Sequence, residues 1–201
     1  MDLGPVAGRD PTVVPDPSRK AAVLIPVIDG ADPELVFIER AANLLEHPGE
    51  MGFPGGGYEP KDGDRQATAV RESGEEIGLL PEEITPVGRL DDIETVTGYT
   101  VSPFVARVPE RDYRPTDAEV AEVVPLPVAA LTDPENHTFE PREHPEYGTV
   151  PCHHFRVGDY TIWGATARML VQLLTVGTEW ETPEPPAQSL GELIGGEGIG
   201  D

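Results

Sequence analysis

The sequence predicts an α/β protein, built as a three-layer α/β/α sandwich around a mixed β-sheet. Two segments, one in the middle of the chain and one near its end, have apolar residues at helical spacing. Several short apolar runs are typical of strands. A length of 201 residues is enough for one domain with a sizeable core. We expect this domain at 20–177, between a flexible arm at 1–19 and a disordered acidic tail at 178–201.

The first part of the chain is expected to contain two strands and then a loop that leads into a helix. Residues 1–19 are rich in Pro, Gly and Asp, which predicts a loosely held arm. The apolar run at 21–28 predicts a buried strand, and 35–39 predicts a second one. The loop and the first helix occupy 53–79.

The remaining elements are predicted from the same kinds of signal. Two strands at 84–93 and 99–108 are expected to join through a turn at Thr97-Gly98. They are followed by a strand at 120–126, a helical turn at 127–131, a polar loop at 134–146, and a hairpin of 152–157 with 159–162 that turns at Gly158. The second helix is expected at 163–176, where apolar residues recur at helical spacing.

The strongest chemical signal is a short acidic stretch in the first helix. At 100° per residue, Glu72, Glu75 and Glu76 share one face, while Val70 and Ile77 lie on the opposite face. Two carboxylates ~6 Å apart repel by roughly 3 kcal/mol at an effective dielectric of 20. A divalent cation would turn this repulsion into attraction. The alternative is a solvated acidic face, and the glycines that precede the helix argue against it.

The loop before this helix contains three consecutive glycines at 55–57, which let the backbone approach a ligand closely. Asp62 and Asp64 are each suited to cap the helix, and Gly78 is suited to end it. The local prediction is therefore a loop, an acidic helix and a tight stop.

This segment resembles the signature of the Nudix hydrolases, G-x5-E-x7-R-E-U-x-E-E-x-G-U, in which U is bulky and apolar. A match of this length is highly specific, and the resemblance covers roughly residues 21–176. The family has the α/β/α sandwich that the element order predicts. The matching positions are Gly57, Arg71, Glu72, Glu75, Glu76, Gly78 and Leu79.

Two positions depart from this pattern. Gly63 stands where the family has its first Glu, and Ser73 stands at an apolar position. In the family that Glu helps to hold the loop on the helix, often through the Arg, so its absence concerns loop rigidity more than the metal site. Asp62 or Asp64 could reach Arg71 instead. Ser73 lies at the edge of the buried stripe and should be tolerated.

The stretch before the signature is similar to the extra motif of the coenzyme A diphosphatase branch of this family. In that motif an Arg and a small residue, then Arg or Leu, then Gly, precede FPGG at fixed spacings; here these are Arg40, Leu45, Gly49 and the FPGG of 53–56. Ile38 stands where the branch prefers Thr. An isolated arginine is more often solvated or paired, but the fixed distance to FPGG favours a substrate-binding role for Arg40.

The resemblance implies a metal-dependent hydrolase of a diphosphate linked to another group. Oxygen ligands without soft neighbours favour Mg²⁺ or Mn²⁺. We expect Glu72 and Glu76 to be direct metal ligands, Glu75 to be a ligand or the water-activating base, and Arg71 to orient Glu72 or Glu75. Backbone amides of Gly55, Gly56 and Gly57 are expected to line the substrate site. A base from a distant strand is common in the family, and Glu119 and Glu122 are candidates.

By resemblance the substrate is coenzyme A or a derivative, cut to 3′,5′-ADP and 4′-phosphopantetheine. One alternative is a Nudix diphosphatase that acts on NADH, ADP-ribose or dinucleoside polyphosphates. A second alternative is a catalytically silent nucleotide-binding module, although such modules typically lose the glutamates retained here. A zinc site formed by Cys152 and the histidines nearby is disfavoured, because neighbouring strand residues point to opposite faces and no CxxC or HxxxH spacing occurs.

The composition restricts the partners. Thirty-seven acidic against fourteen basic residues give a formal charge of −23, and only Lys20 and Lys61 are lysines. Such a surface disfavours nucleic acids and anionic membranes, because affinity for phosphate backbones comes largely from Lys and Arg. It also suggests a halophilic cytoplasm, where the Debye length shrinks to ~3 Å. The expected partner is a small nucleotide, and a homodimer is compatible with the sequence.

The compartment is expected to be the cytoplasm. Cys152 is the single cysteine, which excludes an internal disulfide and fits a reducing interior. The first residues have no apolar stretch typical of a secretory leader. No apolar run approaches 18 residues, so no membrane span is expected.

Overall fold

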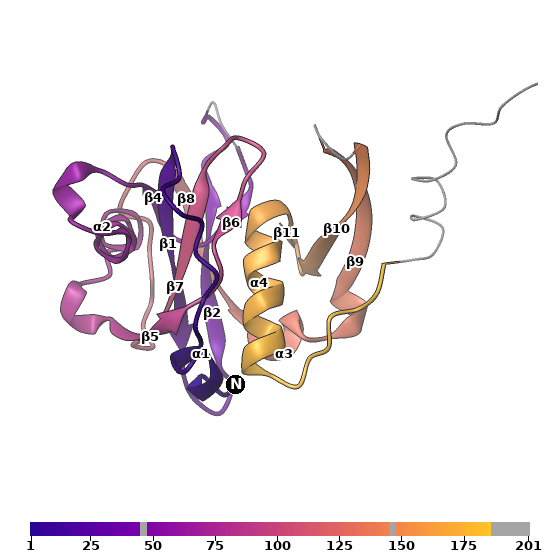
Figure 1. Ribbon diagram of the computed structural model, residues 1–201. Helices are drawn as coiled ribbons and strands as arrows, with labels where there is room; N and C mark the ends of the chain where they lie inside the picture. Colours follow the sequence, from indigo (N-terminus) through magenta and orange to yellow (C-terminus); the bar gives the residue numbers. More distant parts are fainter. Residues whose placement is uncertain (45–47, 145–147, 186–201) are drawn as a thin grey trace, which may run out of the picture.

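The protein has the predicted three-layer arrangement, with a mixed β-sheet between two helices (Figure 1). The structure is a computed structural model that describes residues 1–44, 48–144 and 148–185, with the side chain of His144 excepted. Helix α2 (Arg65–Ile77) covers one face of the sheet and α4 (Gly164–Gly177) covers the other. The predicted fold class is confirmed.

The central sheet is built around β1 (Lys20–Ile28), which pairs in parallel with β7 (Thr100–Val108) and antiparallel with β2 (Glu34–Arg40). The strand order is β3-β2-β1-β7-β5, and β4, β6 and β8 pair with β1, β7 and β2. The other strands of this sheet are β3 (Met51–Gly52), β4 (Gly55–Gly57), β5 (Thr85–Arg89), β6 (Ile93–Glu94) and β8 (Val120–Pro127).

Each face of the sheet has its own hydrophobic core, because side chains alternate across a strand. Ala69 and Ile77 of α2 pack with Val36 of β2. On the other face, Leu170 of α4 packs with Phe37. Burial on both faces holds β1 and β2 at the centre of the fold, and β1 packs directly against α2.

Local signals set the ends of α2 as expected. The Asp64 side chain accepts a hydrogen bond from Ala67 N at 2.7 Å and caps the helix. Gly78 follows the last turn with a φ of 65°, a left-handed conformation that favours glycine. Ser73 is fully buried rather than at the edge of the stripe, and its Oγ donates to Ala69 O at 2.7 Å.

The prediction of a loosely held arm at 1–19 is wrong. A short helix α1 (Gly4–Ala7) packs against α4 and β5, and Leu3 and Val6 are 3% and 0% exposed. Asp2 N donates to Gly177 O at 2.8 Å, which ties the first residues to the end of α4. The two apolar side chains join the core on the α4 face, and their burial outweighs the loop-like composition of this segment.

The predicted polar loop at 134–146 is also wrong. After a 3₁₀ turn at Pro134–Asn136, the chain forms β9 (His137–His144), which pairs with β10 (Gly148–Val157), and β10 pairs with β11 (Tyr160–Ile162). This three-stranded sheet lies beyond α4, on the side away from the main sheet (Figure 1). Pairing with β10 satisfies the backbone of a polar segment that has little apolar signal of its own.

Two further segments differ from the expectation. The strand expected at 84–93 is interrupted after Arg89, because the Asp92 side chain is buried and accepts hydrogen bonds from Arg65 and Ser102. In the segment expected to begin the tail, the ring of Trp180 lies against Phe155. Residues 186–201 lie outside the described part of the chain.

Three short helical segments complete the fold: 3₁₀ turns at Pro60–Asp62 and Pro81–Glu83, and α3 (Val128–Leu131). Within the described ranges, no helix has the length and apolar character needed to cross a bilayer.

Candidate active site

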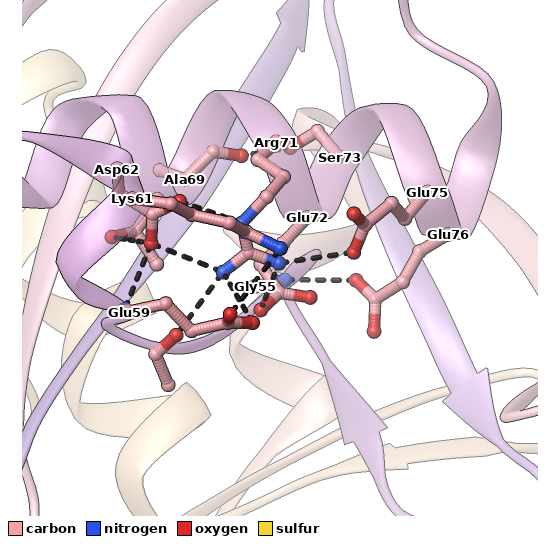
Figure 2. A network of polar contacts seen from close by, with 12 residues as sticks. Gly55, Glu59, Lys61, Asp62, Ala69, Arg71, Glu72, Ser73, Glu75 and Glu76 are labelled. Carbon is pink, nitrogen blue, oxygen red and sulfur yellow. Dashed lines mark hydrogen bonds and ion pairs between the residues drawn. The ribbon is translucent and has the colours of Figure 1, made fainter.

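The acidic helix α2 runs beside the glycine strand β4, and one glutamate joins the two elements (Figure 2). Gly55 N donates a hydrogen bond of 2.8 Å to Oε2 of Glu76. The Glu76 side chain is buried, since the residue is only 6% exposed. This carboxyl is therefore fixed in position by the loop that the sequence predicted as a backbone-lined site.

Burial raises the pKa of Glu76 to about 8. Desolvation is the main cause, and the nearby carboxylates Glu72 and Glu119 raise the pKa further. The Gly55 amide and the Arg40 guanidinium act in the opposite direction. Glu76 is thus a buried acid surrounded by more negative than positive charge.

Glu72 occupies the space beside the middle glycine of the loop. A Cβ atom built on Gly56 would lie only 2.4 Å from Glu72 Oε1 and 2.6 Å from Cδ, so only glycine fits there without displacing the carboxylate. The same oxygen lies 2.9 Å from Arg71 Nη1. Burial raises the pKa of Glu72, and the Arg71 guanidinium opposes this shift.

Arg71 is anchored by Asp62, the nearer of the two aspartates weighed from the sequence. Arg71 Nε and Nη2 donate to the two Asp62 oxygens at 2.7 and 3.2 Å, and Nη2 also donates to Gly57 O at 3.2 Å. These hydrogen bonds hold the pKa of the Asp62 carboxyl well below its usual range. Asp62 therefore makes the contact between the loop and the helix, which Gly63, at the position of the family's first Glu, cannot make. Asp64 instead caps the helix.

Glu75 differs from the other two glutamates of the helix. Its side chain is 53% exposed, and Oε2 accepts a hydrogen bond from Arg71 Nη1 at 3.0 Å. The same Arg71 nitrogen thus contacts both Glu72 and Glu75 (Figure 2). Among the described residues, no three His, Cys, Asp or Glu side chains gather closely enough to form a complete metal cage.

The carboxylates of Glu72 and Glu76 nevertheless fit a hard divalent cation whose other ligands are waters or substrate oxygens. Glu72 and Glu76 lie one helical turn apart, and within the described residues Glu76 Oε1 makes no hydrogen bond (Figure 2). Mg²⁺ in proteins usually keeps several waters and binds through one or two carboxylates plus substrate phosphates. Burial raises the pKa of both carboxyls, so a bound cation would stabilise their charged forms.

Arg40, at the end of β2, faces this group of acids. Its Nη2 lies 3.9 Å from Glu119 Oε2, and its Nε is buried without a hydrogen-bond partner in the described residues. Glu119 is 61% exposed at its side chain. Glu122, the other candidate base, instead accepts a hydrogen bond from Tyr160 of β11 at 3.0 Å and is turned to the second sheet.

Of the other two motif positions between Arg40 and FPGG, Gly49 lies within the described residues. Gly49 has a φ of 71° and its N donates to Arg40 O at 3.0 Å, so this glycine closes the turn between β2 and β3. Leu45, the intermediate position of the motif, lies outside the described residues.

The histidines near Cys152 do not form the disfavoured zinc site in the described part of the chain. His137 Nε2 and His153 Nδ1 share a hydrogen bond of 2.9 Å, whereas His154 is buried elsewhere and contacts Cys152 O. Burial lowers the pKa of His137 and of His153, the latter to about 4. His153 is half-buried and His154 is buried.

Known proteins match this sequence and this fold. The NUDIX domain family matches residues 18–147. An uncharacterized Nudix hydrolase, NudL, from Cronobacter sakazakii is 34% identical over 157 residues, which are 77% of this chain and 81% of the relative. NudL of Escherichia coli is 33% identical over 164 residues, 80% of this chain and 84% of the relative. The crystal structure of a MutT/nudix family protein from Enterococcus faecalis shares the fold, with a TM-score of 0.54, 13% identity, and coverage of 93% of this chain and 68% of that chain.

The domain match spans more than half of the chain, and the curated relatives cover most of it. The membership of the Nudix family that the acidic helix indicated is confirmed. The chain belongs to the Nudix family: it is a hydrolase of phosphorus-containing anhydrides whose substrates are nucleoside diphosphate-linked compounds.

Proposed function

We propose that this Nudix hydrolase is a Mg²⁺- or Mn²⁺-dependent coenzyme A diphosphatase. It would cut the diphosphate of coenzyme A or a derivative to give 3′,5′-ADP and 4′-phosphopantetheine. Nudix hydrolases generally use divalent metal ions, and the choice between these two ions is part of the proposal. The observation that carries the assignment is the position of Arg40 relative to the glycine loop and the acidic helix.

Arg40 has the properties of a residue that binds a substrate anion. Its guanidinium is only weakly paired, at 3.9 Å from Glu119, and one of its buried nitrogens has no partner in the described residues. An unpaired buried donor is costly unless a ligand satisfies it. Arg40 is also close enough to lower the pKa of Glu76, so a diphosphate bound at the acids would lie within its reach.

The residues of α2 and β4 divide the work of the reaction. Glu72 and Glu76 would hold the metal ion, which when bound neutralises charge on the diphosphate and lowers the pKa of the attacking water. The amides of residues 55–57 would line the site around the diphosphate. Arg71, anchored on Asp62, keeps Glu72 in position next to the loop.

Two acids are candidates for the group that takes the proton from water. Glu75 is exposed and hydrogen-bonded to Arg71, and Glu119 is exposed beside Arg40. A Glu75→Gln variant that kept full turnover would exclude Glu75 as the base and leave Glu119. We also infer that the protein works in a cytoplasm of high salt, supported by the formal charge of −23 and the single cysteine.

The test is a chromatographic assay of the phosphomonoester products formed from coenzyme A, NADH, ADP-ribose and a dinucleoside polyphosphate, each with and without Mg²⁺, at low and high KCl. We expect coenzyme A to be the best substrate and activity to require the metal. Turnover of only NADH or ADP-ribose would contradict the coenzyme A assignment. An absence of turnover under every condition would favour a silent nucleotide-binding module.

A further inference from the structure

A cleft of about 730 Å³ opens at the far end of β4, beside Gly57. Its walls come from the segment that leads into β1, from the end of β4 and from the start of β7. They include Arg19, Lys20, Tyr58 and Tyr99. The volume lies within the range of ligand pockets, ~300–1,000 Å³. The smaller cavity of about 300 Å³ between α2 and β5 is lined mainly by apolar residues.

Arg19 is held in this cleft without a carboxylate partner. Its Cζ lies 3.7 Å from the centroid of the Tyr99 ring, and its Nη1 donates to Thr97 O at 2.9 Å. Among the arginines of the described ranges, only Arg19 and Arg168 form no ion pair with a carboxylate. In a chain with a formal charge of −23, an oriented and unneutralised guanidinium is well placed to bind an anion.

Lys20 adds a second positive charge next to Arg19. Its Nζ is 3.8 Å from Asp16 Oδ1, and because the Asp16 side chain is fully exposed this pair is weak. Lys20 O accepts a hydrogen bond from Tyr58 N at 2.9 Å, which holds the Tyr58 backbone against the start of β1. The cleft thus combines two cations and the exposed carboxylate of Asp16 with two aromatic rings.

Strand β4 extends from the active site to this cleft, since its last residue Gly57 lines the cleft. A strand rises about 3.3 Å per residue, so Gly57 lies ~7 Å from Gly55, the residue that contacts Glu76. Gly57 O accepts from Arg71, and a Cβ atom on Gly57 would meet no atom within 4 Å, so the backbone is open on this side. A ligand with its diphosphate at the acids can therefore extend one end into the cleft.

We propose that this cleft binds the nucleotide half of coenzyme A, with Arg19 and Lys20 contacting the 3′-phosphate and the tyrosine rings lining the base. This inference rests on the proposed function and adds the residues that determine specificity. A phosphomonoester carries a charge of about −1.5 to −2 near neutral pH, and Arg binds phosphate through two parallel hydrogen bonds. NADH, ADP-ribose and dephospho-coenzyme A lack this phosphate, so the cleft selects against them.

The first test compares kcat/KM for coenzyme A and dephospho-coenzyme A, with Mg²⁺ and constant KCl. We expect the wild-type protein to prefer coenzyme A and Arg19→Gln to reduce the ratio of the two values by roughly tenfold. Arg168→Gln is the matched control, because Arg168 lies on α4 and donates to Glu94 O at 2.9 Å. An Arg19→Gln variant with the wild-type ratio overturns the inference while the coenzyme A diphosphatase activity stands.

The second test measures binding of 3′,5′-ADP and 5′-AMP by calorimetry and does not depend on turnover. The wild-type protein should bind 3′,5′-ADP more tightly, and Arg19→Gln should lose this difference, while Arg19→Lys should recover part of it. Equal affinity of the wild-type protein for both nucleotides contradicts the phosphate site. A preference for 3′,5′-ADP that depends on Arg19 supports the site even if coenzyme A is not hydrolysed.

Discussion

Arg71 organises the charges on the active-site face of α2. One side of its guanidinium binds Asp62 and the loop carbonyl of Gly57, and the other side contacts Glu72 and Glu75. A single cation thus links the loop to the helix and limits the repulsion among the acids. Glu76 is left outside this network and depends on the Gly55 amide.

Removal of the charge on Asp62 should destabilise the protein. Asp62→Asn is expected to lower the free energy of unfolding by about 1–3 kcal/mol at pH 7, because the aspartate side chain is only 2% exposed and pairs with Arg71. The depressed pKa of Asp62 means that this contribution is present above the unfolded pKa of about 3.9 and is lost as the pH falls through the folded value. Denaturant unfolding of both proteins between pH 7 and pH 2 measures it. A variant as stable as wild type at pH 7 refutes the anchoring role.

A methyl group on Gly56 should disable the site without unfolding the protein. In Gly56→Ala the new Cβ would lie 2.4 Å from Glu72 Oε1, so the Glu72 carboxylate would have to move away. A shift of ~1 Å in an active site can reduce the rate about 100-fold. Gly52→Ala in the adjacent β3 is the control, since its nearest contact would be Ile38 Cγ1 at 4.0 Å. Hydrolysis rates and melting temperatures of both variants test this: only Gly56→Ala should lose activity, and both should stay folded. Equal rates for the two variants would show that Glu72 does not need this position.

Glu76 should make the metal-free protein less stable as the pH rises. Its folded pKa of about 8 lies above the unfolded value of about 4.3, so the folded state binds the extra proton between these values and loses stability across this window. Glu76→Gln should therefore gain stability relative to wild type between pH 5 and 9, in the absence of divalent ions, and should also lose hydrolysis. Unfolding curves at several pH values test this. A difference in stability that is the same at every pH would contradict a buried acid of raised pKa.

The elements with strong local signals were predictable, and those that depend on distant partners were not. The apolar run of β1 and the capped amphipathic pattern of α2 each specify their own structure. In contrast, β9 is polar and becomes a strand only through pairing with β10. The helical wheel placed the three glutamates on one face. It could not predict the burial of Glu76, because this burial depends on the contact of β4 with α2 and a wheel describes one helix alone.

The N-terminal segment shows the same limit at the scale of a single element. A four-residue helix has no reliable periodicity, yet Leu3 and Val6 are buried against α4 and β5. Leu3→Ala should lower the free energy of unfolding by about 2–5 kcal/mol, as for other buried leucines. Val13→Ala serves as the control, because Val13 is 48% exposed and should change stability by less than about 0.5 kcal/mol. Equal changes in the free energy of unfolding for the two substitutions would instead support a loosely held arm at 1–19.

The charge of the whole molecule should make its stability depend on salt. A formal charge of −23 produces self-repulsion in the compact state, and screening shortens the Debye length from about 10 Å at 0.1 M salt to about 3 Å at 1 M. We expect the melting temperature to rise between 0.1 M and 3 M KCl. Calorimetric melts at both concentrations test the expectation, and equal melting temperatures would contradict a halophilic protein.

The carboxylates on one face of α2 are expected to bind a hard divalent cation. A calorimetric titration of the metal-free wild-type protein with Mn²⁺, beside the Glu72→Gln/Glu76→Gln double variant, tests it most directly, with Glu82→Gln as a control outside the helix. Saturable Mn²⁺ binding is expected for the wild type and for the control, and the double variant should lose it. Equal Mn²⁺ binding by the wild-type protein and the double variant would contradict it.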